Sequence, residues 1–399
     1  MTTKTTSLVF TGDIGFDKYM KDKWSDPALL SSDVASFLKS GSHLIVNVEG
    51  PLYDGAYEKK ENSVAALLHS MDPNVRHFLA GIGADIWNIC NNHIMDAGEN
   101  GIRSTLEYAK ECNATAFGAG LDIAGASSPV ILNEAGGIGM IGVGYQRACR
   151  KAGDDHAGCF SWSDLDLIRK QIDSIKKTCR YCIISAHAGE EFTALPSPYT
   201  RDRYISYLDM GADIVIAHHP HVVNNYELFD NKAIFYSLGN FIFDTDYQRS
   251  QFGTEYGILL KLNFTEETFT FEHMGIKVDR TSEHIISCPA PAIFTHVDEK
   301  EYKLLRSLAA KVLIENTKKQ LRYLKPDEYG SATEDDFVKN FYEPLRSGRV
   351  PGETLDMQII YPLSLEVTRQ DWRSSRLPDV VEYCLAQIDP ASLSQQPPS

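Results

Sequence analysis

Five histidines, two carboxylates and an asparagine follow the ends of predicted strands, where side chains from different strands can meet. They are Asp13, Glu49, Asn92, His93, His187, His218, His219 and His221. A single histidine after a strand is most often a hydrogen-bonded structural residue. A cluster of this composition at one sheet edge is more typical of a metal site. A dinuclear hydrolase needs a carboxylate that bridges its ions, neutral imidazoles, and an open position for water.

The types of these side chains limit which metal ions can bind. The His-x-His spacing of His219 and His221 lets one short loop serve two ions. A mixed nitrogen and oxygen set suits Mn, Fe or Zn better than Mg or Ca. His93, next to Asn92, can protonate a leaving group because imidazole titrates near neutral pH. The residues therefore predict two divalent transition-metal ions, with His93 as the catalytic acid.

Five polar residues in or beside the same segments, His218 among them, are expected to bind substrate or to orient the ligands. They are Asn47, Asp96, Glu191, His218 and Asn240. Glu191 could bind a substrate amine or orient His187, and we favour the orienting role. Asn240 follows a strand, and its type favours a structural role in a turn.

Short apolar segments alternate with amphipathic ones through the first two thirds of the chain. The predicted strands lie within residues 7–13, 43–50, 84–92, 181–189, 212–221 and 233–241. Predicted helices cover 101–113, 163–177 with Ser163 as N-cap, and 197–211 with Gly211 as C-cap. Alternating strands and helices are typical of a layered α/β domain. The polar residues stand at the carboxyl ends of the strands, where open α/β sheets bind ligands.

The pattern changes towards the C-terminus. Residues 257–285 read as a hairpin that turns at 265–268, and amphipathic helices are predicted at 299–324, 336–348 and 379–388. We therefore expect a catalytic domain over 1–285 and a mostly helical C-terminal extension over 286–389. The polar segment 390–399 is expected to be a disordered tail.

Bulk composition excludes several classes of partner. The 399 residues carry a formal net charge of -15, which disfavours binding to nucleic acid. A small acidic or phosphorylated substrate remains compatible with this net charge, because bound cations reverse the local field.

No apolar run is long enough to span a bilayer, and no secretory signal is apparent. Eight scattered cysteines fit a reducing compartment, and Cys179 and Cys182 are expected to be free thiols. These features predict a cytoplasmic protein without a membrane partner; the oligomeric state is not defined.

Six motifs also resemble a known family. T-G-D, N-x-E-G, N-N-H-x-x-D-x-G-x-x-G, H-x-G-x-E, G-A-D-x-V-I-x-H-H-P-H-V and I-x-Y-S-L-G-N-F-x-F follow one another within residues 7–246. They resemble the CapA-type (poly-γ-glutamate capsule biosynthesis) branch of the calcineurin-like metallophosphoesterases. The resemblance implies a four-layer α/β/β/α sandwich. It also implies one ion held by Asp13, Glu49 and His221, a second ion held by Glu49, Asn92, His187 and His219, and His93 in the acid position.

The chain departs from the wider family pattern at three places. Asp13–Ile14–Gly15 replaces the usual D-x-H, so the first ion lacks the histidine that this motif supplies, and only one of the two ions is bound if that loss is decisive. Asn47 competes with Glu49 for the bridging position. Ala188 and Ala217 replace residues that are usual in the pocket.

Three functions fit the sequence. The first is hydrolysis of a phosphoester, or of an amide of an acidic small molecule or of polyglutamate, by a metal-bound water. The second is a non-hydrolytic accessory role in poly-γ-glutamate or natural-product biosynthesis. The third is a metal-assisted ligase or transferase component. His93 favours the hydrolase, because a purely structural metal site needs no acid.

Overall fold

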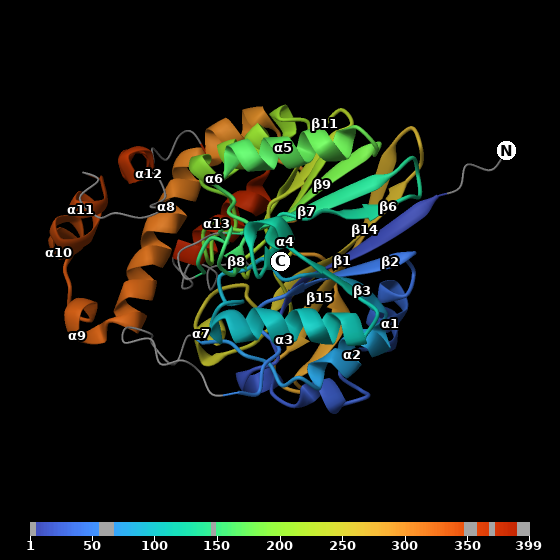
Figure 1. Cartoon of the computed structure of the whole chain (residues 1–399). Coiled ribbons are helices and arrows are strands. Elements are labelled where there is room, and N and C mark those ends of the chain that lie inside the picture. Colours follow the sequence, from blue (N-terminus) through green and yellow to red (C-terminus); the bar gives the residue numbers. More distant parts are fainter. Residues whose placement is uncertain (1–4, 56–67, 145–148, 347–356, 367–371, 389–399) are drawn as a thin grey trace.

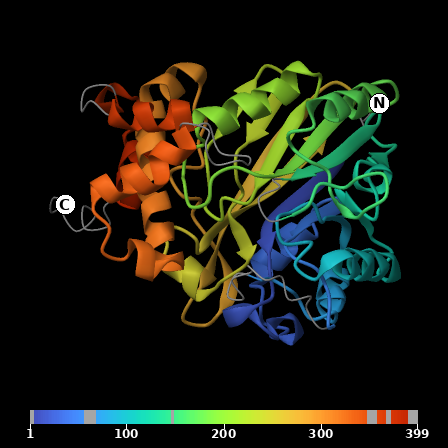
Figure 2. The same ribbon diagram turned by 60° about the vertical axis from the view of Figure 1, so that its left-hand side comes forward.

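Two β-sheets pack face to face, and helices cover the outer side of each (Figures 1 and 2). The structure is a computed structural model that describes residues 5–55, 68–144, 149–346, 357–366 and 372–388. The expected four-layer α/β/β/α sandwich is confirmed, and a helical region follows it in the chain.

The first sheet combines N-terminal parallel strands with a C-terminal antiparallel meander. Its order is β16 (His284–Cys288), β15 (Phe269–Asp279), β14 (Tyr256–Phe264), β1 (Thr6–Ile14), β2 (His43–Val48), β3 (Ala84–Asn88) and β4 (Thr115–Phe117), and β13 (Asn240–Ile242) also pairs with β1. The predicted hairpin is β14 and β15, with the Thr265 amide donating to the Thr268 carbonyl at its turn. β16 extends this hairpin by an edge strand that the sequence did not indicate.

The second sheet has a parallel centre and two antiparallel edges. Its order is β11 (Tyr226–Phe229), β12 (Lys232–Phe235), β10 (Ile214–His218), β9 (Tyr181–His187), β7 (Ile138–Gly144) and β6 (Val130–Leu132). The short strands β5 (Ala119–Gly120) and β8 (Gly158–Cys159) pair separately. The sequence prediction missed β6 and β7. In β7, glycines at 139, 142 and 144 interrupt the apolar run that would have marked a buried strand.

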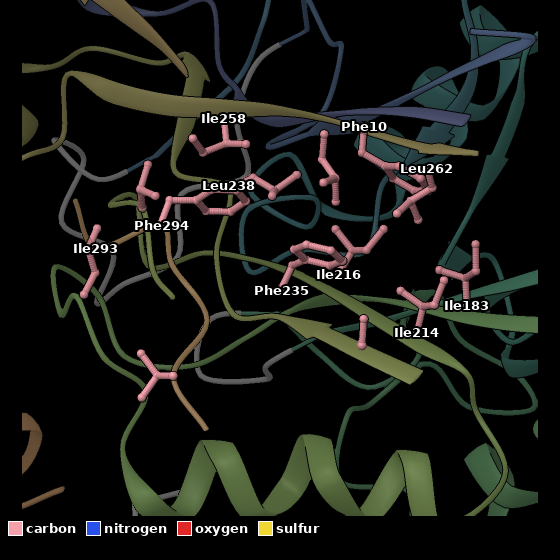
Figure 3. Close-up of a cluster of buried hydrophobic side chains, with 14 of the residues drawn as sticks. Phe10, Ile183, Ile214, Ile216, Phe235, Leu238, Ile258, Leu262, Ile293 and Phe294 are labelled. Carbon is pink, nitrogen blue, oxygen red and sulfur yellow. The ribbon is translucent and has the colours of Figure 1, made fainter. Parts of the chain in front are cut away.

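Side chains alternate between the two faces of each strand, and this alternation separates the layers. Phe10 points into the space between the sheets, where it meets Ile183 and Ile216 of the second sheet (Figure 3). Leu8 belongs to the same cluster. Val9, between them in sequence, packs with the helices on the outer face. Both faces of these strands are therefore buried, as near-continuous apolar strands require.

The outer helices lie on opposite sides of the sandwich. α1 (Ser32–Leu38), α2 (Val75–Ile82) and α3 (Gly98–Glu111) cover the first sheet, and α5 (Leu165–Lys176) and α6 (Pro198–Asp209) cover the second. Short helices α4 (Ile123–Ala126) and α7 (Asp246–Arg249) lie in connections. The predicted N-cap Ser163 is wrong, because the Asp164 side chain accepts from the Leu167 amide at the start of α5.

The C-terminal helices pack against the sandwich. α8 (Glu299–Leu324) is the long predicted helix, and α13 (Pro378–Ile388) is the last. Leu305 of α8 and Val380 of α13 belong to the same apolar cluster as Phe10. Between them lie α9 (Pro326–Tyr329), α10 (Glu334–Phe337), α11 (Glu343–Arg346) and α12 (Met357–Leu365). The helix predicted over 336–348 is divided by a π-helical segment, Val338–Tyr342, and its last two residues lie outside the described residues.

The segment predicted as one strand over 233–241 instead joins the two sheets. β12 ends at Phe235 in the second sheet, and β13 begins at Asn240 in the first. The crossing needs Gly239, whose φ is +68° and whose Cβ would lie 2.6 Å from the Tyr256 carbonyl oxygen. This crossing places Asn240 beside Asp13.

Among the described residues, no helix combines the length and apolar character needed to cross a bilayer. All eight cysteines are described, and all are free thiols, including the pair Cys179 and Cys182. The disordered tail predicted for residues 390–399 lies outside the described residues.

Candidate metal centre

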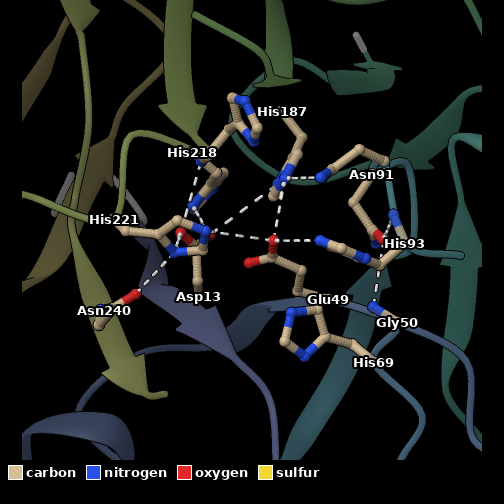
Figure 4. Close-up of polar contacts among 12 residues, drawn as sticks. Asp13, Glu49, Gly50, His69, Asn91, His93, His187, His218, His221 and Asn240 are labelled. Carbon is tan, nitrogen blue, oxygen red and sulfur yellow. Dashed lines mark hydrogen bonds and ion pairs between the residues drawn. The ribbon is translucent and has the colours of Figure 1, made fainter. Parts of the chain in front are cut away.

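The carboxyl ends of strands from both sheets converge on one cluster (Figure 4). Asp13 stands near the end of β1, and Glu49 directly follows β2. His187 ends β9 and is the register partner of His218 at the end of β10. The predicted residues therefore meet, although they come from segments more than 200 positions apart in the sequence, as Asp13 and His219 illustrate.

Glu49 occupies the middle of the cluster and is fully buried. One of its oxygens, Oε1, lies 3.5 Å from His187 Nε2, 3.5 Å from His221 Nε2 and 4.0 Å from His93 Nε2. Within the described part of the chain, neither carboxylate oxygen has a hydrogen-bond partner. A buried carboxylate without partners is costly unless a cation compensates it. This orphaned carboxylate fits a metal ligand.

Asp13 is the second buried carboxylate, and several donors surround it. Its oxygens lie 3.3 Å from His221 Nδ1 and 3.5 Å from His218 Nδ1. The Asn47 amide nitrogen donates to Asp13 at 2.8 Å. Burial alone would raise the pKa of Asp13, but the contacts with His218 and His221 hold that pKa well below its usual range. Asp13 is therefore an anion at neutral pH.

Among the residues that the structure describes, two sets of donor atoms are close enough to hold an ion. One consists of Glu49, His219 and His221, and the other of Asp13, Glu49 and His187. Glu49 is common to both. The sets divide the histidines differently from the grouping that the family resemblance implies. Asn92 is adjacent as expected, with its Oδ1 2.9 Å from His187 Nε2.

Asn47, the alternative to Glu49 as the ligand shared by two ions, uses its side-chain amide in other hydrogen bonds. Its amide nitrogen contacts Asp13 and lies 3.2 Å from His187 Nδ1, while its carbonyl accepts from the Asn88 amide at 2.9 Å. This geometry favours Glu49 as the shared ligand. Asn47 also makes the contact with His187 that was expected of Glu191, at His187 Nδ1. Asp13 Oδ1 lies 3.9 Å from the same nitrogen.

The protonation states of the metal-free cluster suit ligation by two of the imidazoles. Burial lowers the pKa of His187 to about 3 and that of His219 to about 3, so both rings are neutral, as metal binding requires. Burial raises the pKa of Glu49 to about 8. Burial opposes protonation of His221, but Glu49 and Asp13 together raise its pKa to about 10.

Metal binding is therefore expected to release protons, and the affinity should increase with pH. At pH 7 the coupled pair of Glu49 and His221 holds at least one proton that ligation must displace. Each released proton changes the dissociation constant by about tenfold per pH unit below the pKa of its group. Calorimetric titration with Mn²⁺ at pH 6.0, 6.75 and 7.5, in buffers of different ionisation enthalpy, measures both quantities. A pH-independent affinity with no proton release would contradict these ligand assignments.

Residues 218–221 form the HHPH loop, and His93 lies on the other side of Glu49 from it (Figure 4). Its Nδ1 lies 2.8 Å from Asp96 Oδ2, which orients the ring and leaves Nε2 towards Glu49. Burial, reinforced by the neighbouring His69, lowers the pKa of His93 well below its usual value. The free ring is therefore neutral at pH 7. Asp96 is thus placed to stabilise the imidazolium when a proton is taken up.

His69 belongs to the cluster but was missed by the sequence prediction. Its ring meets His93 edge to face with centroids 4.2 Å apart, its Nδ1 pairs with Asp17, and its backbone amide donates to Asp96. No predicted strand precedes His69, so the strand-end pattern that identified the other histidines gave no signal for it.

Asn240 contacts a candidate metal ligand in addition to the structural role in a turn that was expected of it. Its Oδ1 lies 3.0 Å from His221 Nδ1, and its amide nitrogen donates to Gln248 and to the Thr254 carbonyl. His221 itself has φ +56°, and His219 has φ +94°. Left-handed conformations of residues other than glycine persist only where their surroundings hold them. The HHPH loop is thus fixed by its contacts.

The cluster of carboxylates and imidazoles at the strand ends of an α/β/β/α sandwich is the arrangement that the resemblance to metallophosphoesterase-like proteins implied. The family described as "Bacterial capsule synthesis protein PGA_cap" matches residues 7–245, and the chain belongs to this family.

Curated relatives include the PGA biosynthesis protein CapA of Bacillus subtilis (strain 168), 27% identical over 253 residues, and the capsule biosynthesis protein CapA of Bacillus anthracis, 26% identical over 257 residues. Each alignment covers 61% of this chain, and the chain spans 65% and 61% of the two relatives, less than two thirds of either.

Among solved structures, a hypothetical protein from Thermus thermophilus aligns with a TM-score of 0.41 and 14% identity, over 68% of this chain and 99% of that one. A 5'-nucleotidase precursor from the same organism aligns with a TM-score of 0.39 and 11% identity, over 81% of this chain and 60% of that one.

Proposed function

We propose that the chain is a metal-dependent hydrolase that acts on a phosphoester, or on an amide of an acidic small molecule or of polyglutamate. The observation that carries this proposal is Glu49, a fully buried carboxylate without hydrogen-bond partners among the described residues, surrounded by three imidazoles. Such a carboxylate serves no structural purpose that a neutral side chain would not serve better. Its retention is explained by cation binding.

The residues divide into metal ligands and a proton-transfer pair. Asp13, Glu49, Asn92, His187, His219 and His221 would hold one or two divalent ions, for which Mn, Fe and Zn fit the donor set. When bound, such ions supply activation of water and charge neutralisation at the scissile group. His93 faces Glu49 but does not belong to either set of close donor atoms.

His93 and Asp96 are assigned to proton transfer. Because Asp96 engages Nδ1, the neutral ring offers Nε2 to the site and can take up a proton there. An anionic substrate beside the ring raises the pKa of His93 and favours the imidazolium, which then donates to the leaving group. A metal site with only a structural role would have no use for this oriented pair.

The substrate class is tested by an activity screen. The names of the two relatives refer to PGA and capsule biosynthesis, which supports including γ-glutamyl amides beside phosphomonoesters and phosphodiesters. Protein purified without chelator is expected to cleave at least one of these classes and to lose that activity after chelation. Metal-dependent binding of polyglutamate without cleavage of any substrate would instead favour the accessory role.

Replacing His219 with alanine is expected to lower metal content more than replacing His218. His219 belongs to a set of three close ligand atoms, whereas the His218 ring contacts Asp13 at 3.5 Å and belongs to neither set. Elemental analysis of both purified variants measures the difference, and the adjacent histidine serves as the control. Equal metal content in the two variants would refute the assignment.

A further inference from the structure

The loop between β9 and α6 follows His187 and is held from outside by the C-terminal helices. The carbonyl of Phe192 in this loop accepts from the amide of Asn316 on α8 and, at 3.0 Å, from Gln387 Nε2 on α13. Gln387 Oε1 accepts from the Ala194 amide at 2.9 Å. Asn316 and Gln387 are buried, at 3% and 1% exposure. Two side chains from separate helices thus converge on one peptide group.

Phe192 also touches the HHPH loop directly. Its backbone amide donates to the carbonyl of Pro220 at 2.8 Å, and Pro220 stands between His219 and His221. Phe192 has φ +60°, a left-handed conformation that a residue other than glycine adopts when its surroundings hold it there. The hydrogen bonds on both sides of this residue supply that restraint.

The Phe192 ring completes the connection to the metal centre. It stacks on the His221 ring with centroids 5.9 Å apart and planes 26° apart. Phe243 lies against the same imidazole at 4.9 Å, and Asn240 contacts its Nδ1. Of these three neighbours, Phe192 is the one that α8 and α13 hold by hydrogen bonds.

We infer that Gln387 and Asn316 are positioning residues for the metal centre, which hold Phe192 against His221 and so fix the orientation of that imidazole. The inference rests on the proposed function, since it requires a metal ion at His221. It gives the C-terminal helices, which lie beyond the family match at 7–245, a part in building the site.

The amide chemistry distinguishes this role from simple packing. Gln387 uses both ends of its amide on the backbone of residues 192 and 194, as a neighbouring strand would. A leucine at 387 fills a similar volume but makes neither hydrogen bond. Replacement by leucine therefore separates the directional contact from the volume it occupies.

The test uses full-length protein and Co²⁺ as the probe. Calorimetry measures the dissociation constant, and visible absorption reports the ligand geometry of the bound ion. Gln387→Leu and Asn316→Leu are expected to weaken Co²⁺ binding by roughly tenfold, the usual effect of removing a residue that orients a ligand. Both substitutions should also change the absorption spectrum of bound Co²⁺.

Phe192→Leu, which leaves both side-chain amides in place, should reproduce these effects. Gln320→Leu on α8, an amide with no role in this contact, is the matched control and should behave as wild type.

Three results would overturn the inference. Wild-type affinity and spectrum in Gln387→Leu and Phe192→Leu would show that the contact does not reach His221. Equal losses in Gln320→Leu would show general loosening of the helices instead of positioning. A wild-type protein that binds no Co²⁺ would overturn the proposed metal-dependent function as well. Normal Co²⁺ binding by wild type and by the variants would overturn the positioning role alone.

Discussion

Replacing His93 with alanine is expected to lower turnover by roughly 10²–10⁴-fold, the usual contribution of a general acid or base. Metal content should remain close to that of wild type, because His93 Nε2 lies 4.0 Å from Glu49 and belongs to neither set of close ligand atoms. Steady-state kinetics and elemental analysis on the same preparation measure both properties. The result would separate proton transfer from metal binding.

The neighbouring residue provides the matched control for His93. Asn92 Oδ1 faces His187 Nε2, so Asn92→Ala should weaken metal binding itself. The loss in His93→Ala should shrink for substrates with good leaving groups, which need little protonation. Asp96→Asn should cause a smaller loss, because it retains a hydrogen-bond partner for His93 Nδ1 but removes its charge. Wild-type turnover of every substrate by His93→Ala would exclude the acid role.

Replacing Glu49 with glutamine is expected to abolish measurable metal binding at micromolar metal. Residues that merely orient ligands contribute about 10–100-fold to metal affinity, so a shared direct ligand should contribute at least about 100-fold. The metal-free variant should nevertheless remain folded, because burial raises the pKa of Glu49 to about 8 and the acid it replaces is mostly uncharged at pH 7. Added metal at 100 times its dissociation constant should stabilise wild type by about 2.7 kcal/mol and leave the variant unchanged.

Glu190 offers a matched control for this substitution. It is also a buried acid, but its carboxylate accepts hydrogen bonds from Ser197 and Thr200 and lies in neither set of ligand atoms. Glu190→Gln should therefore retain wild-type metal content. Thermal unfolding with and without Mn²⁺ compares the three proteins. A normal metal-induced shift in Glu49→Gln would contradict the central position assigned to Glu49.

The strand ends explain why so much of the site could be predicted from the sequence. Parallel strands bring their carboxyl ends to one edge, so polar residues directly after apolar segments must meet there. Asp13, Glu49, His187 and His219 satisfy this rule and lie together. The layered fold follows from the same alternation of strands and helices.

Features that depend on tertiary contacts escaped this reasoning. His69 reaches His93 from a segment without a strand, so no local pattern identifies it. The apolar run over 233–241 resembles one strand, but it changes sheets at Gly239 because a positive φ and a close backbone contact are available there. The contact of Gln387 with the loop at 192–194 joins segments nearly 200 residues apart. Only the folded chain reveals such pairs.

The most direct test of the metal-dependent hydrolase is a metal titration of activity. Wild-type protein is stripped with chelator, and Mn²⁺, Fe²⁺ or Zn²⁺ is added back while bound metal and hydrolysis are measured in the same samples. We expect stripped protein to be inactive and turnover to rise in proportion to bound metal, up to one or two ions per chain. Turnover that is unaffected by removal of the metal, or full metal loading without hydrolysis of any phosphoester or γ-glutamyl amide, would contradict the proposed function.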